Sequence, residues 1–351
     1  MQNLKTIVIG CGAIAREHLK ALRSMPSARI EAVCDLSAAR AESTADRFQV
    51  SRWGTDYREL IEATSPSVVH ITTPPSSHVA IASYCLGRGI NVLCEKPVAL
   101  SSVEFDQLSE LARSNNCSLV ENQNLRLHSS VAKINDLIAS GQFGEVVHVD
   151  IFFSLPLVAQ GSPYTDPNAP HFGANLPGGV IGDFLPHIAY LSIALAGTVS
   201  EVRTLWSNRS NRLFAADEFR AILKGERCSA TVGFSATSNV SGYWIRVLGS
   251  EMHAEADLLE PPRIVYKKHR NGEPAVMSVV DGISESWSVF TGSFSAFFRK
   301  LAGTSSYDGL DSFVARFYEA LSGTAALPVS LAEVRESVGL VERLTSQGSR
   351  L

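Results

Sequence analysis

The stretch "IVIGCGAIAREHL", residues 7–19, decides how the first third of this chain folds. An apolar run ends at Gly10 and Gly12, and a helical pattern starts behind them. The first glycine of such a turn permits a sharp bend, the second admits a pyrophosphate, and a small third residue, here Ala15, lets helix pack on strand. A plain strand-to-helix corner is the alternative. The context favours a dinucleotide site at the start of the helix, formed by four residues: Gly10, Gly12, Ala13 and Ile14.

Asp35 ends the second apolar run, residues 29–35. An acid about 20 residues beyond the glycines is where the adenosine ribose is bound in such folds. A carboxylate accepts hydrogen bonds from a 2′-hydroxyl and repels a 2′-phosphate, which predicts NAD as the cofactor. Two alternatives stay open. Asp35 could serve merely as the cap of the next helix, or Arg40 could reach a 2′-phosphate, in which case NADP is possible.

Short apolar runs alternate with helical patterns over the first part of the chain. The runs cover residues 6–10, 29–35, 67–73, 90–96 and 117–122. Runs that are apolar on consecutive positions are typical of strands buried on both faces, and strict alternation with helices predicts a parallel sheet. We therefore expect residues 1–122 to form an NAD(P)-binding Rossmann domain with a doubly wound parallel sheet.

The pattern changes after residue 122. Runs with alternating polar and apolar residues cover 145–155, 218–225, 228–236, 243–249 and 263–268. This period predicts a large, mostly antiparallel open sheet in a second domain, residues 123–351, for substrate binding and oligomerisation. Helical patterns follow at about 309–322 and 330–347, and the last can pack back on the first domain. The Pro- and Gly-rich stretch 162–179 is either a functional loop or a mere connection.

Composition excludes several classes of protein. The chain has 351 residues, of which 45% are hydrophobic and 19% charged, with a net charge of −4. Nothing in it resembles the basic patch of a nucleic-acid-binding protein. The six cysteines are scattered without ligand spacing, so we expect no metal site and a reducing compartment. Without a signal peptide or a long apolar run, we expect a cytoplasmic protein with no membrane contact.

Two further motifs carry side chains suited to chemistry. Glu95-Lys96-Pro97 ends a predicted parallel strand, so a cation lies where doubly wound sheets bind ligands. A solvated turn is the alternative. Asp183 and His187 are four residues apart, on one face of a helix expected to start near the preceding glycines, although Pro186 limits where it begins. A purely structural histidine is the alternative there.

These motifs together resemble one family. The ordered set is Gly10-x-Gly12-x-x-Ala15, "TTPPSSHVAIA" (72–82), "CEKP" (94–97) and "GGVIGDFLPH" (178–187). It resembles the oxidoreductases named for glucose–fructose oxidoreductase, inositol dehydrogenase and the rhizopine protein MocA. The resemblance implies hydride transfer between nicotinamide and a secondary alcohol or ketone of a sugar, nucleotide-linked sugar or cyclitol. It also implies a homodimer or homotetramer paired through the C-terminal sheet.

The resemblance implies roles for individual residues. Lys96 matches the lysine that supports the reacting oxygen, His187 the general acid/base, and Asp183 the carboxylate that orients the substrate. Pro97 resembles a proline that can follow a cis peptide. The positions implied to contact the cofactor are Thr73, Pro74, His78, Glu95, Lys96 and Gln123. Those implied to contact the substrate are Lys96, Asn124, Arg126, Asp183 and His187.

The chain departs from the family pattern near the acid/base pair. Val180 and Leu185 stand where glycines are usual, and Tyr190 stands where an aspartate is frequent. Other activities stay open: an NAD-dependent glycoside hydrolase of the same fold, or a non-catalytic dinucleotide-binding regulator. An apolar cluster is expected in the domain core or at a subunit contact, formed by Phe290, Phe294, Phe297 and Phe298.

Overall fold

The computed structural model describes residues 3–166, 171–210, 214–259, 263–268 and 307–346, and the phenylalanine cluster at 290–298 lies outside them. The chain divides into two compact units. The first comprises residues 1–127 with 307–339, and the second comprises 128–306 with 340–351.

The first unit contains a parallel sheet with the strand order β3-β2-β1-β4-β5-β6. Its strands are β1 (Leu4–Ile9), β2 (Ala28–Cys34), β3 (Trp53–Gly54), β4 (Val68–Ile71), β5 (Asn91–Cys94) and β6 (Leu119–Glu121). The order reverses between β1 and β4, which in doubly wound sheets opens a crevice for a ligand beyond the strand ends. The predicted Rossmann fold is confirmed, and the turn after β1 lies at that reversal.

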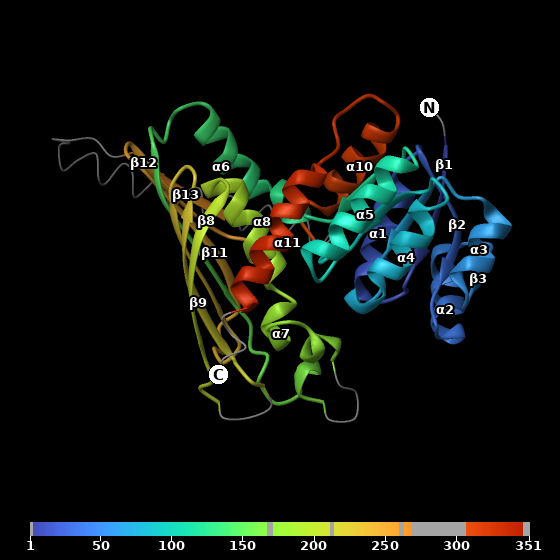
Figure 1. Ribbon diagram of the computed structural model, residues 1–351, viewed down its shortest axis with the longest axis horizontal. Coiled ribbons are helices and arrows are strands. Elements are labelled where there is room, and N and C mark those ends of the chain that lie inside the picture. Colours follow the sequence, from blue (N-terminus) through green and yellow to red (C-terminus); the bar gives the residue numbers. More distant parts are fainter. Residues whose placement is uncertain (1–2, 167–170, 211–213, 260–262, 269–306, 347–351) are drawn as a thin grey trace. The chain divides into compact units, whose positions relative to one another are not determined.

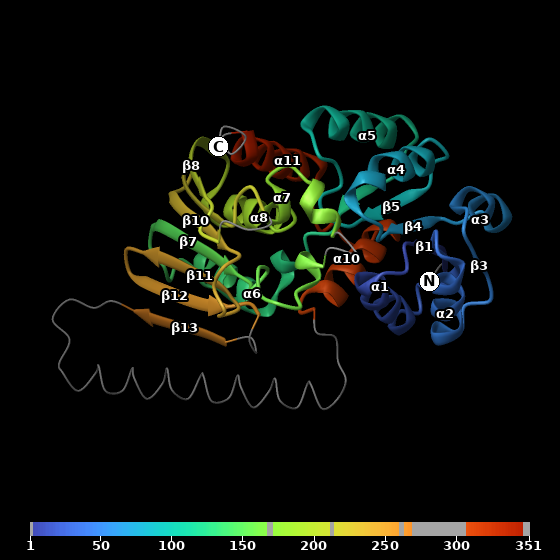
Figure 2. The ribbon, with the colours of Figure 1, turned by 90° about the horizontal axis from the view of Figure 1, so that it is seen from below.

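Helices cover both faces of this sheet (Figure 2). One face carries α1 (Ala13–Ser24), α2 (Ala38–Phe48) and α10 (Leu310–Leu321), and the other carries α3 (Tyr57–Thr64), α4 (His78–Leu86) and α5 (Ser102–Ser114). The central strands β1 and β4 are buried on both sides: Ile7, Val8 and Val69 each have no exposed surface. This explains the consecutive apolar residues in their sequences.

The C-terminal part of the chain contributes to the first unit as well. Leu310, Phe313, Val314 and Phe317 of α10 are fully buried and belong to the same core as β1 and β4. The division predicted from sequence, 1–122 and 123–351, differs from the observed one at this helix. The last helix, α11 (Leu331–Ser346), is shared between the units, which divide after Gly339.

The second unit contains a seven-stranded sheet with the order β13-β12-β11-β7-β10-β9-β8 (Figures 1 and 2). Its strands are β7 (Val146–Ser154), β8 (Val199–Ser207), β9 (Glu218–Gly225), β10 (Ser229–Ser235), β11 (Gly242–Gly249), β12 (Met252–Asp257) and β13 (Arg263–Lys268). Only the β7–β10 pair is parallel among the paired strands described. The mostly antiparallel open sheet predicted from the alternating runs is confirmed.

Two helices cover one face of the second sheet, α6 (Ser129–Ala139) and α8 (Leu185–Ala196) (Figure 1). Phe153 of β7 meets Phe184, the residue before α8, edge-on at 5.2 Å between ring centroids. Its neighbour Phe152 therefore projects from the opposite face, since successive strand residues point to opposite sides. The opposite face bears the polar residues of the alternating pattern.

The helix predicted to carry both Asp183 and His187 is instead two helices. The short α7 (Gly179–Gly182) ends before Asp183, and α8 starts at Leu185 with Pro186 in its first turn. Pro186 has no N–H to donate to the carbonyl of Gly182, and its ring would collide with that carbonyl in a continuous helix. The predicted shared face was therefore wrong: Asp183 lies at the junction, and only His187 is helical.

Candidate active site

The two glycines after β1 differ in what requires them. Gly10 has φ +95°, and a Cβ added to it would lie 2.6 Å from the carbonyl oxygen of Thr72. Gly12 caps α1 with φ −74°, and a Cβ added to it would meet no atom within 4 Å. The fold itself thus demands Gly10. Gly12 instead leaves open space at the helix N-terminus, where Ala13 and Ile14 present main-chain amides.

Asp35 lies beside the same turn. One of its carboxylate oxygens accepts a hydrogen bond from the main-chain N–H of Cys11 at 2.9 Å, and the other accepts from Ser37 at 2.9 Å. Arg40 approaches the carboxylate at 3.7 Å, and 60% of its side chain is exposed. Asp35 therefore joins the end of β2 to the glycine turn, and its negative charge lies where a ribose would be bound in this fold.

His78 joins two segments of the predicted cofactor site. Its ring is fully buried, with Nδ1 2.8 Å from the carbonyl of Pro97 and Nε2 2.8 Å from the carbonyl of Thr73. Burial lowers the pKa of His78, although both carbonyls favour the protonated ring. The ring thus links the Thr73–Pro74 segment to the turn after β5, rather than presenting a nitrogen to a ligand.

The turn after β5 carries Lys96. The peptide bond between Lys96 and Pro97 is cis, as the motif implied, and the Lys96 side chain is half-buried. Glu95 is buried, and one of its oxygens lies 2.9 Å from Nε2 of His18 and 2.6 Å from Nδ2 of Asn122. Burial alone would raise the pKa of Glu95, but these hydrogen bonds, with the charges of His18 and Lys96, lower it to about 2. A buried carboxylate thus stands beside Lys96.

The segment after β6 was predicted to contact cofactor and substrate. Gln123 is fully buried, its amide donating to Glu121 at 2.9 Å and its carbonyl oxygen accepting from Arg126 at 3.2 Å. The Arg126 guanidinium also pairs with Glu333 of α11. Asn124 opens the short helix η2 (Asn124–Leu127) and is buried. In this structure both polar ends of Gln123 are engaged within the first unit, so the ligand contacts of all three residues stay predictions.

In the second unit, Asp183 and His187, the two residues predicted to serve as substrate-orienting carboxylate and acid/base, both have ordered partners. Nδ1 of His187 lies 2.7 Å from the hydroxyl of Tyr190, one turn further along α8. The hydroxyl of Tyr164 donates to a carboxylate oxygen of Asp183 at 3.3 Å, and Asp183 is buried. Tyr190 thus occupies, with a phenol, the place at which the family pattern often has a carboxylate. It holds the His187 ring without placing a negative charge beside it.

Sequence reasoning did not single out Tyr164 and His171. Tyr164 lies in η3 (Pro163–Thr165), and its ring centroid is 4.0 Å from that of His171, which caps η4 (Phe172–Asn175). Both belong to the stretch 162–179, whose composition left a functional loop and a mere connection as alternatives. Their contacts place an aromatic surface beside Asp183. The composition of the stretch 162–179 indicated a possible functional loop. It did not indicate which residues of that loop lie near Asp183.

The residues of the first unit fit a dinucleotide. The open space at Gly12, the amides of α1 and the carboxylate of Asp35 are the groups that a pyrophosphate and an adenosine ribose require. Within the described residues, no group of three or more His, Cys, Asp or Glu side chains could hold a metal ion. In the same part of the chain, every helix is too short or too polar to cross a membrane.

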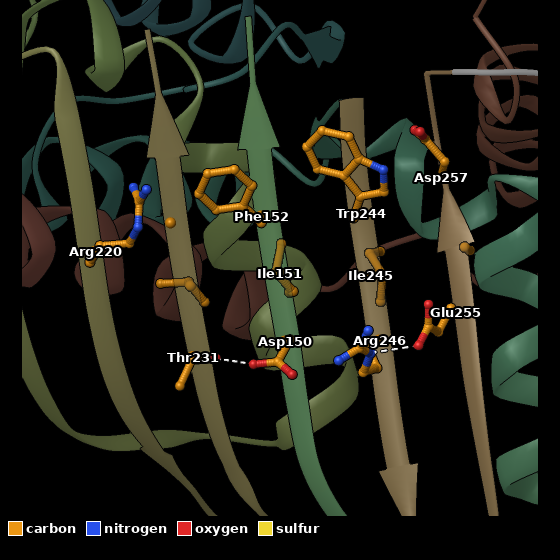
Figure 3. A pocket seen from close by; sticks show the side chains of 13 residues that line it. Asp150, Ile151, Phe152, Arg220, Thr231, Trp244, Ile245, Arg246, Glu255 and Asp257 are labelled. Carbon is orange, nitrogen blue, oxygen red and sulfur yellow. Dashed lines mark hydrogen bonds and ion pairs between the residues drawn. The ribbon is translucent and has the colours of Figure 1, made fainter. Parts of the chain in front are cut away.

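A separate hollow of about 600 Å³ lies on the open face of the second sheet (Figure 3). The Arg220 guanidinium lies 4.5 Å from the ring centroid of Phe152, which stacks on Trp244 at 5.9 Å. Arg246 pairs with Glu255 across β11 and β12 at 2.7 Å. Because α8 packs on the other face, this hollow is separate from His187.

Comparison with known proteins agrees with both units. Residues 4–123 match an oxidoreductase family model with an NAD-binding Rossmann fold, and residues 131–255 match the GFO/IDH/MocA C-terminal domain. Inositol 2-dehydrogenase of Salmonella typhimurium is 27% identical over 172 residues, 48% of each chain. D-apiose dehydrogenase of Paraburkholderia graminis is 24% identical over 224 residues, 64% of this chain and 57% of the relative. The chain spans about half the length of the curated relatives it matches.

Solved structures share the whole fold. A levoglucosan dehydrogenase bound to NADH and levoglucosan has a TM-score of 0.77 at 16% identity, over 99% of this chain and 98% of its own. The WlbA dehydrogenase of Bordetella pertussis, bound to NADH and UDP-GlcNAcA, has a TM-score of 0.75 at 16% identity, over 99% and 96%. At these identities the likeness is one of fold. With a family model matching in each unit, the chain belongs to the GFO/IDH/MocA family of oxidoreductases.

Proposed function

We propose that this protein is an NAD-dependent dehydrogenase that oxidises a secondary alcohol of a sugar, nucleotide-linked sugar or cyclitol, or reduces the corresponding ketone. The observation that carries the proposal is the ordered acid/base pair: Tyr190 holds the ring of His187, and Tyr164 holds Asp183. Lys96 supplies the third group, from a turn that His78 links to Thr73. A pure dinucleotide binder would not need this set.

The turn after β1 would hold the cofactor. The amides at the start of α1 would bind the pyrophosphate above Gly12, and Asp35 would accept the ribose hydroxyls. NAD, when bound, accepts a hydride from the alcohol carbon or returns it to the ketone. The carboxylate of Asp35 supports NAD over NADP, since a 2′-phosphate would be repelled by it.

The side chains of this chain would move the proton and stabilise the oxygen. His187 would take the hydroxyl proton at Nε2, because its Nδ1 is hydrogen bonded to Tyr190. The Lys96 ammonium would stabilise the negative charge that develops on the substrate oxygen. Asp183 would accept hydrogen bonds from a neighbouring hydroxyl and so orient the substrate ring.

The substrate class is supported by relatives and by the loop beside Asp183. The relatives named above are an inositol dehydrogenase and a D-apiose dehydrogenase, and two related structures hold levoglucosan and UDP-GlcNAcA. The rings of Tyr164 and His171 lie 4.0 Å apart between centroids at an interplanar angle of 40°, and they form an aromatic wall next to a carboxylate. Small-molecule sites combine such apolar walls with a few placed polar groups.

A spectrophotometric panel tests this function. The purified protein, with NAD or NADP, is given inositols, free sugars and nucleotide sugars, and nicotinamide absorbance is followed. We expect one class to drive reduction, and we expect Lys96→Ala and His187→Ala to lose at least about 100-fold in turnover while still binding NADH. Lys133→Ala, an exposed lysine on α6, is the matched control and should keep full activity.

Two outcomes would replace this proposal. Release of an aglycone from glycosides without net NADH would indicate a hydrolase that uses NAD transiently. Tight NADH binding with no turnover in either direction, and no effect of Lys96→Ala, would indicate a regulator. Full activity in either active-site variant would remove that residue from the mechanism.

We also propose that the open face of the second sheet pairs with another copy of this chain, giving a homodimer or homotetramer. The face carries both signs of charge: Arg246 lies between Asp150 and Glu255, and Arg220 lies further along the sheet beside Phe152 (Figure 3). It also exposes 62% of Ile222 and 67% of Leu205 on neighbouring strands. A face with mixed charges and exposed apolar side chains can be complementary to itself.

A further inference from the structure

Two buried histidines lie behind Glu95 in the first unit. Nε2 of His18, on α1, lies 2.9 Å from a carboxylate oxygen of Glu95. The Nδ1 atoms of His18 and of His70, on β4, lie 2.8 Å apart, and the two rings meet at an interplanar angle of 87°. Since Nδ1 must face Nδ1 across a hydrogen bond, one of the two nitrogens carries a proton and the other does not.

Two hydroxyls extend this row of hydrogen bonds. Nε2 of His70 lies 3.2 Å from the hydroxyl of Tyr318, on α10, which lies 2.7 Å from Oγ1 of Thr6, on β1. The Thr6 hydroxyl also lies 3.2 Å from the carbonyl of Leu4. His18, His70 and Thr6 have no exposed surface, and Tyr318 has 1%. We call His18, His70, Tyr318 and Thr6 the histidine chain.

One arrangement of protons pairs every group with both histidines neutral. The ionised Glu95 can only accept, so Nε2 of His18 carries a proton and donates to it. His70 then donates from Nδ1 to His18 and accepts at Nε2 from the hydroxyl of Tyr318. The Thr6 hydroxyl then donates to the hydroxyl oxygen of Tyr318, 2.7 Å away, because the Tyr318 proton is engaged with His70. Every ring nitrogen and hydroxyl of the four residues in the histidine chain then has a hydrogen-bond partner.

A second arrangement pairs every group with one proton more. His18 carries protons on both nitrogens and donates from Nδ1 to His70. His70 now donates from Nε2 to Tyr318, Tyr318 donates to Thr6, and Thr6 donates to Leu4. His70, Tyr318 and Thr6 each carry one proton in both arrangements, and His18 changes from one to two. The added proton comes from solvent.

The surroundings place the added charge on His18. Burial and the charge of His18 hold the pKa of His70 well below its usual value, so His70 stays neutral. Glu95 faces His18 directly. The other titratable groups that interact with Glu95 come from the neighbouring elements: His78 on α4, Cys94 and Lys96 at the end of β5, Glu121 on β6 and Tyr307 before α10.

We infer that the histidine chain sets the charge beside Lys96: uptake of one proton by His18 cancels the charge of Glu95 and reverses the hydrogen bonds from His18 to Thr6. His70, Tyr318 and Thr6 are then positioning residues, which act on Lys96 through His18 and Glu95. The link to catalysis rests on the proposed function, whereas the proton uptake does not. When His18 is neutral, Glu95 offsets the Lys96 cation. When His18 is charged, the full field of Lys96 acts on the substrate oxygen.

Nitrogen NMR of the histidine rings tests the inference in the full chain. The protein is labelled with ¹⁵N in its histidine rings and titrated from pH 8 to pH 5. The His18 and His70 signals are assigned by their ring-to-ring contact and by the signal lost in His70→Asn. We expect His70 to exchange its Nδ1 proton for one on Nε2, without gaining charge, at the same midpoint at which His18 becomes doubly protonated.

Tyr318→Phe is the decisive variant. Among the described residues, it removes the acceptor that Nε2–H of His70 has in the charged state, and buried N–H groups without a partner are rarer than unpaired acceptors. We therefore expect the shared midpoint to fall by about one pH unit. Tyr243→Phe is the matched control, because the buried hydroxyl of Tyr243 has no hydrogen-bond partner within the described structure. It should leave the midpoint in place.

The outcomes separate the two proposals. Independent titration of the two rings, no change of the His70 tautomer, or an unmoved midpoint in Tyr318→Phe would overturn the histidine chain, whatever the enzyme assay shows. If the midpoint moves and a substrate has been found, the pH profile of kcat should move with it while KM stays constant. An unmoved profile would overturn the link to Lys96. Coupled titration without any turnover would leave the histidine chain intact and count against the dehydrogenase alone.

Discussion

Tyr190 and Asp35 are two single side chains that set hydrogen bonds and charge in the candidate site. The phenol of Tyr190 holds Nδ1 of His187 at 2.7 Å and contributes no negative charge, where a carboxylate would also stabilise the protonated ring. The Asp35 carboxylate holds the glycine turn through Cys11 and keeps a charge beside Arg40. At this scale the sequence identified both positions, but not which contacts the side chains make.

Removing the Tyr190 hydroxyl should lower turnover without unfolding the protein. Tyr190→Phe loses one hydrogen bond to His187, worth about 1.4 kcal/mol or tenfold in rate. Tyr190→Asp should move the acidic limb of the kcat pH profile upwards, because a carboxylate raises the pKa of the neighbouring imidazole. The measurement is the pH profile of each variant, with melting temperature as the control for folding. A profile unchanged by the aspartate would show that Tyr190 does not act on His187.

Asp35→Asn should weaken the preference for NAD over NADP. The amide oxygen can still accept from Cys11, so the glycine turn is kept while the charge is removed, and Arg40 is released towards a 2′-phosphate. We expect the ratio of NADPH to NADH affinity to rise at least about tenfold, a change of about 1.4 kcal/mol. Fluorescence titration with both reduced cofactors measures it. An unchanged ratio would mean that Asp35 serves only to hold the turn.

Strands could be predicted from the sequence where burial is uniform along the strand. They were missed where the backbone is irregular or the buried side chains are small. All strands of the first sheet except β3 were predicted, because both of their faces are buried, whereas Trp53 of β3 is 39% exposed. β8 was not predicted: a register shift between Val199 and Glu201 breaks its alternation, and its buried residues Val199, Val202 and Trp206 fall at helical spacing. β12 presents two alanines to the core, Ala254 and Ala256, so its apolar signal is weak.

The residues of the candidate site could likewise be predicted from the sequence only in part. Ordered motifs located the glycine turn, Lys96 and His187, because those positions follow from strand ends and helix starts. Pro186 divided the helix that was to align Asp183 with His187, and the sequence alone could not say on which side the break would fall. Tyr164 and His171 come from a loop without periodicity, where no pattern reports which side chains converge.

The turn between β1 and α1 yields a matched pair of substitutions. Gly12→Ala should leave the melting temperature within about 2 °C, because its φ is negative and its Cβ meets no atom, yet weaken NADH binding at least tenfold, about 1.4 kcal/mol. Gly10→Ala should destabilise the fold by at least about 1 kcal/mol, since φ is positive and the Cβ would contact the Thr72 carbonyl. Normal NADH affinity in Gly12→Ala would mean that the phosphate does not approach this turn.

At the scale of the whole molecule, the open face of the second sheet predicts that the protein forms a homodimer or homotetramer. Ile222→Asp should dissociate the homo-oligomer to monomers or shift its dissociation constant at least about 100-fold, because a charge replaces an apolar side chain in the proposed contact. Val103→Asp is the control, since Val103 is 68% exposed on α5 of the first unit. Light scattering coupled to size-exclusion chromatography measures the mass. A monomeric wild-type protein would remove the proposal.

The buried carboxylate of Glu95 makes global stability depend on acid. Its pKa is about 2 in the folded chain and near 4.5 otherwise, so its ionised form stabilises the fold above about pH 4.5. That stabilisation, about 3 kcal/mol, is lost as the pH falls from about 4.5 to 2. Glu95→Gln should therefore unfold more easily at pH 7 and lose less stability over that range. Denaturant unfolding at several pH values measures both, and equal slopes would contradict the assignment.

The position of α10 has a consequence for how the protein is made. Phe313, Phe317 and Tyr318 complete the core of the first unit, yet they leave the ribosome about 180 residues after the last residue of the N-terminal segment of that unit. Until α10 has been synthesised, part of one face of the nascent Rossmann sheet is uncovered, and His70 lacks its hydrogen-bond partner Tyr318. Cutting the gene after Leu127 would therefore yield an incomplete module, one that a chaperone would bind and a protease would degrade.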